Sequence, residues 1–176
     1  MKKSLLLIIG AFIILITCSC SDDDELTFSK SPYTGTELKT NGYYYRETQH
    51  ENGDIYYEAY FLYRDGTILY ADYFPKKDVL SKEEDYKNLV WINGAKKAKY
   101  VWGAFKIETN TIIYEMWGTS EKPLSAYHWS GTILNDTTYL ITNSCRVNNK
   151  ECKTWNFLFH FKAFSPKPDS TNVFVK

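Results

Sequence analysis

Few side chains in this sequence have the types and spacing that chemistry requires, and the first candidates are two glutamates. If Asn52-Gly53 is a two-residue turn, Glu47 lies directly across from Glu58 on neighbouring strands. Two carboxylates about 5 Å apart are what a retaining glycosidase uses. This pairing, however, places both on an outer wall without a cleft, where like charges need water around them. We interpret them as solvated surface charges, and no enzyme activity is predicted.

A second candidate is a charged pair inside the fold. With two-residue turns at Asn52-Gly53 and Asp65-Gly66, Arg46 faces Ala59, and Ala59 faces Asp72. Two strand spacings separate the charged residues by roughly 10 Å at the backbone, which an extended arginine can span. Two interpretations stay open. The pair could serve only to neutralise two buried charges, or it could orient a polar group in an aromatic cavity.

Strands must position these side chains. Residues 43–74 alternate in polarity and contain the two turn dipeptides, which is typical of three strands in a meander. An amphipathic segment over 78–91 predicts one short helix, with Ser81 and Glu84 as its capping box. The predicted strands cover residues 42–50, 55–63, 67–74, 99–108, 111–117, 124–134, 138–147 and 151–164. We therefore predict an all-β fold, an eight-stranded antiparallel up-and-down barrel with one short helix between the third and fourth strands.

Aromatic residues make up 17% of the chain, and they decide what the inside of this barrel would contain. Alternation predicts an inward face with Tyr44 and Arg46 on the first strand, odd-numbered residues 57–63 on the second and even-numbered residues 68–74 on the third. It also predicts Phe105 and Tyr114 on the fourth and fifth strands, Tyr127 on the sixth, and Leu140 and Thr142 on the seventh. The inward residues expected to contact a ligand combine a large ring or a charge. They are Tyr44, Arg46, Tyr70, Asp72, Trp129 and Trp155.

The first residues are typical of a secretory signal. Lys2 and Lys3 precede an apolar stretch over 5–16, and Cys20 follows the small residue Ser19. This arrangement resembles the lipobox of bacterial lipoproteins, which implies that Cys20 is acylated, with Cys18 as the alternative. The acidic run 22–25 resembles the export signal of Bacteroides-type surface lipoproteins, although a solvated acidic tether would look the same. We expect a signal peptide over 1–19, a tether over 20–39, the barrel over 40–164 and a tail over 165–176.

The resemblance implies a protein anchored by lipid in the outer membrane and exposed on the cell surface. Two further cysteines fit an exported protein. With Asn148-Asn149 as a turn, Cys145 faces Cys152 at a separation that a disulfide spans. Without Lys2 and Lys3 the net charge falls from zero to −2, so no nucleic-acid partner is predicted. The histidines lack metal-like spacing, and no metal or cofactor is predicted.

Strand count, hairpin order and leader together resemble the lipocalin-like lipoproteins of the Bacteroidota. The chain departs from lipocalins proper at Gly42-Tyr43-Tyr44, where their first strand has Gly-x-Trp, and in the position of the helix. The resemblance implies that a small hydrophobic or amphipathic ligand binds inside the barrel. The alternative is a barrel filled by its own rings that acts as a structural module or binds proteins or glycans. Whether the interior holds a cavity of at least ~300 Å³ distinguishes the two.

Overall fold

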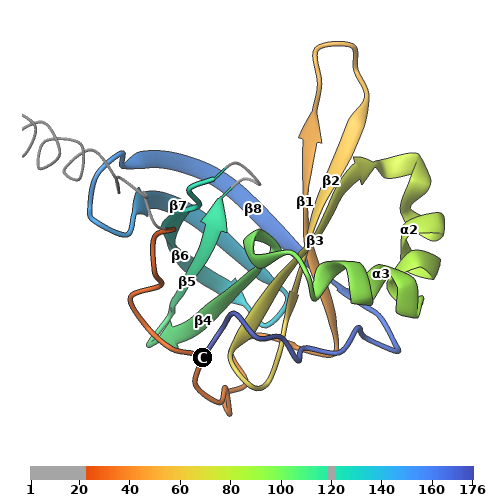
Figure 1. Ribbon diagram of the computed structural model, residues 1–176. Coiled ribbons are helices and arrows are strands. Elements are labelled where there is room, and N and C mark those ends of the chain that lie inside the picture. Colours follow the sequence, from red (N-terminus) through yellow and green to blue (C-terminus); the bar gives the residue numbers. More distant parts are fainter. Residues whose placement is uncertain (1–22, 119–121) are drawn as a thin grey trace, which may run out of the picture.

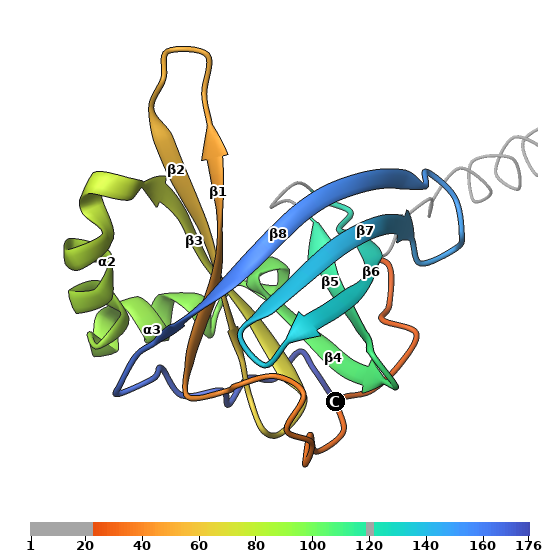
Figure 2. The same ribbon diagram turned by 180° about the vertical axis from the view of Figure 1, so that it is seen from behind.

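The computed structural model describes residues 23–118 and 122–176. Within them, eight strands run antiparallel in sequence order, and β8 pairs with β1 to close a barrel (Figures 1 and 2). The predicted fold is therefore confirmed. The strands are β1 Gly42–Gln49, β2 Ile55–Leu62, β3 Thr67–Pro75, β4 Trp102–Glu108, β5 Thr111–Gly118, β6 Ser125–Asn135, β7 Thr138–Arg146 and β8 Lys153–Ala163.

The helical connection lies between β3 and β4, as expected, but it is longer than one helix. It contains the 3₁₀ turn η1 Lys76–Asp78, the helices α2 Val79–Tyr86 and α3 Leu89–Ala95, and the 3₁₀ turn η2 Lys99–Val101. Asn88 separates the helices because its backbone is extended, and its side chain accepts a hydrogen bond from the N–H of Val90. The predicted capping box was wrong, since α2 begins at Val79, before Ser81.

The first two hairpins use three-residue loops where two-residue turns were predicted. The first loop, residues 51–53, is closed by a hydrogen bond from His50 N–H to Asp54 O, and the second, residues 64–66, by one from Tyr63 N–H to Thr67 O. The last residue of each loop, Gly53 or Gly66, has φ +86°. A loop of this type ends with a residue in the left-handed region, which glycine adopts without strain. One extra loop residue shifts the pairing by one position, and such a shift moves every side chain of a strand to the other face.

This shift overturns the predicted inward face of β2. Arg46 pairs with Glu58, and Tyr45 pairs with Ala59, so that Glu58, Tyr60 and Leu62 point inward. On β3 a bulge opposite Ala59 and Tyr60 restores the predicted pairing of Ala59 with Asp72. The bulge also divides the strand. Ile68 and Tyr70 lie inside as predicted, whereas Asp72 and Phe74 lie outside.

The remaining hairpins mix confirmed and wrong predictions. Phe105 pairs with Tyr114 inside the barrel, as the alternation on β4 and β5 indicated. On β7 the prediction was wrong, because bulges against β6 and β8 bring Tyr139 and Ile141 inward in place of Leu140 and Thr142.

The barrel has a closed end and a mouth. At the closed end Tyr33 and Leu38, which are 8% and 1% exposed, pack into the interior. They belong to the segment expected to be a tether, but residues 23–39 lie against the barrel through hydrogen bonds and apolar contacts. At the mouth the strands diverge. Pairing between β1 and β8 stops at Tyr45 and His160, and the β1–β2 hairpin projects beyond the barrel (Figure 1).

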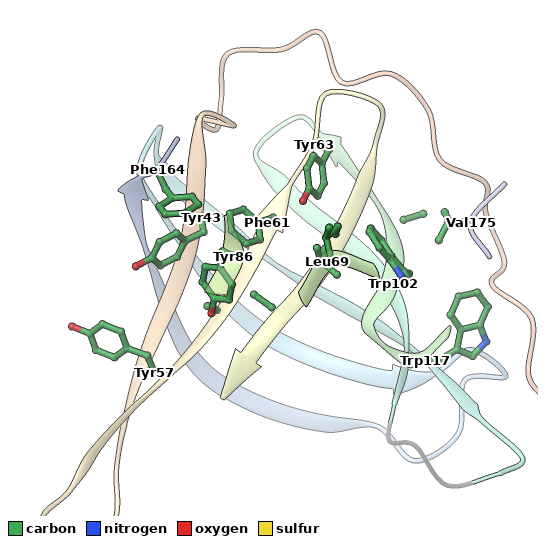
Figure 3. Packing of buried hydrophobic residues seen from close by; sticks show 14 of the residues in the cluster. Tyr43, Tyr57, Phe61, Tyr63, Leu69, Tyr86, Trp102, Trp117, Phe164 and Val175 are labelled. Atoms are coloured by element: carbon green, nitrogen blue, oxygen red, sulfur yellow. The ribbon is translucent and has the colours of Figure 1, made fainter. Parts of the chain in front are cut away.

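A second apolar layer covers the outside of β1 to β4. Figure 3 shows Tyr43 and Phe61 of the barrel wall against Tyr86 of α2 and Phe164, which follows β8. Their ring centroids lie 5.4–6.3 Å apart, mostly edge to face. These strands are thus buried on both faces, and alternation alone could not show which of their faces points inward.

Candidate functional site

Six aromatic side chains form a layer across the interior just below the mouth, and we call them the aromatic belt. They are Tyr60, Tyr70, Tyr114, Trp129, Trp155 and Phe157. Trp129 stacks between Tyr114 and Trp155 with ring centroids 6.0 Å away on each side, and Trp155 stacks on Phe157 at 4.5 Å. Tyr60 lies 5.3 Å from Tyr70 and 6.2 Å from Tyr114. Stacked rings of this kind hold one another in place and form a continuous apolar layer.

A charged pair completes the belt between Phe157 and Tyr60. The guanidinium carbon of Arg46 lies 3.9 Å from the centre of the Phe157 ring, and Arg46 Nε donates to Glu58 Oε2. Glu58 Oε1 accepts a hydrogen bond of 2.6 Å from the Tyr60 hydroxyl. The two charged side chains are 19% and 17% exposed. Charged and aromatic groups together therefore form a closed ring of contacts around the barrel wall.

Burial keeps the belt phenols neutral. It raises the pKa of Tyr60 and of Tyr114 well above the ordinary value, and the nearby carboxylate of Glu58 adds to the effect. The pKa of Tyr70 is also raised, again mainly by burial. A protonated Tyr60 must donate its hydrogen, so Glu58 is the acceptor and remains able to accept further hydrogen bonds.

The interior below the belt is filled by side chains. Tyr60 packs against Phe159 at 5.6 Å, Phe159 stacks on Tyr139 at 4.9 Å, and Tyr139 lies 5.0 Å from Tyr44. Tyr139 is fully buried, and Tyr44 and Phe159 are each 1% exposed. This half of the barrel is a packed core.

A pocket of about 310 Å³ remains at the mouth, above the belt. Its lining combines aromatic rings with one carboxylate and comes from β2, β3, η2, β5 and β6. The lining residues are Glu58, Tyr60, Tyr70, Tyr100, Met116, Trp117, Gly118, Tyr127 and Trp129. The volume lies at the lower end of the range for small-molecule sites, and a few polar groups on apolar walls are typical of such sites.

The structure brings some of the residues predicted to bind a ligand to this site. Tyr70 and Trp129 line the pocket, and Arg46 and Trp155 belong to the ring beneath it. Trp155 also donates from Nε1 to Ser144 Oγ at 2.7 Å. Tyr44 points inward but lies near the closed end, where its hydroxyl donates to the backbone oxygen of Asp136.

The predicted contact between Arg46 and Asp72 was wrong. Asp72 lies on the outer face and forms an ion pair of 2.6 Å with Lys82 of α2. The glutamate dyad does not form either, since Glu47 pairs with Lys76 at 2.8 Å on the outside and Glu58 points inward. The shifted first hairpin causes both errors.

Sequence reasoning missed Glu58 and Tyr60, because the predicted two-residue turn at Asn52-Gly53 placed both on the outer face. It also missed Tyr100, because this residue belongs to a 3₁₀ turn where alternation gives no signal. Tyr127 was predicted to point inward, and it lines the pocket.

A second hollow lies where strands β1 and β8 diverge and no longer pair. It measures about 710 Å³ and is lined by residues of the two diverging strands, Tyr45–Gln49 and Asn156–Leu158 with His160. Beyond Tyr45 and His160 the facing edges of the strands have no ladder between them. We call this hollow the notch. Open strand edges offer backbone donors and acceptors to another chain.

The predicted disulfide is confirmed. Cys145 and Cys152 are bonded across the β7–β8 hairpin, with their Cα atoms 4.0 Å apart. The predicted lipid attachment at Cys20, with its alternative Cys18, lies outside the described residues. Among residues 23–118 and 122–176, no helix is long and apolar enough to cross a membrane. The same residues contain no cluster of three His, Cys, Asp or Glu side chains that could hold a metal ion.

Comparison with protein-family models, with curated proteins and with solved structures found no match to this chain.

Proposed function

We propose that this protein is an outer-membrane lipoprotein, anchored through Cys20, whose barrel mouth binds a small amphipathic molecule. The observation that carries the proposal is the pocket of about 310 Å³ with aromatic walls and a single carboxylate, set above a filled interior. The proposed site is therefore confined to the mouth, whereas the sequence-based hypothesis placed the ligand inside the barrel.

The lining indicates the chemistry of the ligand. The parts of Trp129 and Tyr127 that line the pocket would pack on an apolar surface of the ligand, which contributes about 25 cal/mol for each Å² removed from water. Glu58 already accepts from Tyr60 and Arg46, and a ligand hydroxyl or amine would donate to its remaining lone pairs. A ligand with an apolar face and a hydrogen-bond donor at one end fits both features.

Calorimetric titration with a panel of lipids and glycans tests this proposal. Trp129→Ala removes a pocket wall and should weaken binding by about tenfold. Glu58→Gln should weaken, by a similar factor, the binding of ligands that carry a hydrogen-bond donor. Trp91→Ala is the matched control, because Trp91 packs on Tyr86 outside the barrel. A panel in which no compound binds the wild type, or equal effects of Trp129→Ala and Trp91→Ala, would refute the site.

The anchor has its own test. In cells fed radioactive palmitate, the wild type should carry label and Cys20→Ala should not. Label that persists in Cys20→Ala but is lost in Cys18→Ala would move the anchor to Cys18.

The notch favours a second candidate function, the binding of an extended peptide by strand addition. Arg46–Gln49 on one side and the edge of β8 on the other could each pair with such a segment. Peptides selected from a random library should then protect the backbone amides of these edges from hydrogen exchange. Selected peptides that leave the notch amides unprotected would exclude this function.

A further inference from the structure

The N-terminal segment is fixed to the barrel from its first described residues. Asp24 forms a two-pronged ion pair with Arg146, with distances of 2.7 Å from Nε and 3.1 Å from Nη2. Its carboxylate also accepts from the backbone N–H of Ala126, and its backbone oxygen accepts from Trp117 Nε1 at 2.6 Å. Two-pronged arginine–carboxylate pairs are among the strongest and most directional polar contacts.

The residue before it is held at the same place. Asp23 Oδ1 accepts from the N–H of Leu124 at 2.8 Å, and Oδ2 lies 3.3 Å from Lys99 Nζ. Lys99 in turn lies 4.4 Å from the centre of the Trp117 ring. The acidic run that resembles a flexible tether is therefore, at these two positions, part of the folded domain.

This attachment point lies at the mouth and not at the closed end. Trp117 and Ala126 stand near the end of β5 and the start of β6, and Arg146 ends β7. Trp117 contacts Asp24 and also lines the pocket. From here the segment runs along the outer wall, where Thr27 bonds to Glu115, to Tyr33 at the closed end (Figure 1).

We call these contacts of Asp23 and Asp24 with the barrel the Asp23–Asp24 clamp, and it persists at neutral pH. The hydrogen bonds from Arg146 hold the pKa of Asp24 below its ordinary value, against the opposing effect of burial. Glu115, only 1% exposed, has its pKa raised by burial and lowered by bonds from His128 and Thr27, and the lowering prevails. Both carboxylates are therefore charged under physiological conditions.

Chain length then limits how far the mouth can be from an anchor. Three peptide units separate Cys20 from Asp23, and an extended chain spans at most ~3.6 Å per residue, or about 11 Å in total. Anchoring at Cys18 would extend this to about 18 Å. The eight residues of β5 alone run for roughly 25 Å between the mouth and the closed end.

We propose that the barrel mouth faces the lipid surface, with the rim of the pocket held against the headgroups by the Asp23–Asp24 clamp. This inference rests on the proposed anchoring at Cys20. It makes the headgroup layer the partner of the mouth, so that an amphipathic ligand exchanges between the bilayer and the pocket without crossing bulk water.

Energy transfer from one labelled cysteine to acceptor-labelled headgroups tests the orientation. The lipidated protein is reconstituted into phosphatidylethanolamine–phosphatidylglycerol vesicles after a donor dye is attached at Lys122→Cys, beside the clamp, or at Asn110→Cys, at the closed end. Both positions are exposed, and the disulfide leaves the other thiols of the domain unreactive. The Lys122→Cys dye should lie closer to the headgroups by about 20 Å.

A spacer supplies the control. About twelve Gly and Ser residues inserted after Asp22 add roughly 20 Å of flexible reach and should bring the two transfer efficiencies together. Arg146→Met should act in the same direction by opening the clamp. Equal efficiencies on the vesicle-bound protein without the spacer, or a closer Asn110→Cys dye, would overturn the orientation and leave the anchor intact. A protein whose mass shows no lipid at Cys20 or Cys18 would overturn the anchor and the orientation together.

Discussion

The coupling between Arg46 and Glu58 is a measurable consequence of the register described above. Breaking a fully buried ion pair costs about 3–5 kcal/mol and breaking an exposed pair about 0–1 kcal/mol. These side chains are 19% and 17% exposed, which places the pair between the limits, at about 2 kcal/mol. Arg46→Met and Glu58→Gln should each lower the free energy of unfolding by about this amount. Arg46→Met should lose roughly 0.5–1 kcal/mol more, through its contact with Phe157.

The double mutant decides whether the two residues act as a unit. It should be little less stable than Arg46→Met alone, which gives a coupling energy of about 2 kcal/mol by urea denaturation. The sequence-based pairing supplies the control, since Arg46→Met combined with Asp72→Asn should be additive within about 0.5 kcal/mol. Additivity for Arg46 with Glu58, or coupling of Arg46 with Asp72, would refute the register.

Three further perturbations test other parts of the fold. Lys167 donates to two backbone oxygens, and burial lowers its pKa to about 8. Because the unfolded chain binds this proton more tightly, the free energy of unfolding of the wild type should rise by about 1–2 kcal/mol relative to Lys167→Met between pH 8 and 9.5. Parallel curves of stability against pH would contradict this. Replacing Cys145 and Cys152 by serine should cost about 2 kcal/mol in thermal denaturation, from lost loop closure, and an unchanged midpoint would contradict it. Leu38→Ala should cost about 3 kcal/mol in urea because Leu38 is 1% exposed at the closed end, whereas a loss below about 1 kcal/mol would mean that residues 23–39 are not part of the cooperative unit.

The sequence predicted the barrel and the disulfide because both depend on coarse features. Eight alternating stretches separated by turn residues suffice for a closed meander, and one turn at Asn148-Asn149 suffices to oppose Cys145 and Cys152. Neither requires the inward face of every strand to be known.

The site was only partly predictable, because it depends on register. The Asn52-Gly53 dipeptide fits a two-residue turn, yet the hairpin adds Glu51 to the loop and thereby moves Glu58 inside. The apolar pattern of β2 did not reveal this error. Its outer face packs against helix α2, where Tyr86 covers Phe61, and is therefore as apolar as its inner face. The attachment of the acidic run to the barrel could not be predicted from composition, because Asp24 is held by Arg146, which is 122 residues away in sequence.

Native mass spectrometry of the protein released from cell envelopes in mild detergent tests the central claim, that the mouth pocket binds a small molecule. The wild type and Trp91→Ala should each show an additional bound mass of the same size. Trp129→Ala, which removes a pocket wall and leaves the filled interior in place, should show it at clearly lower occupancy, as a roughly tenfold weaker affinity requires. Equal bound mass in Trp129→Ala and the wild type would contradict the claim, as would a wild type that carries no bound molecule.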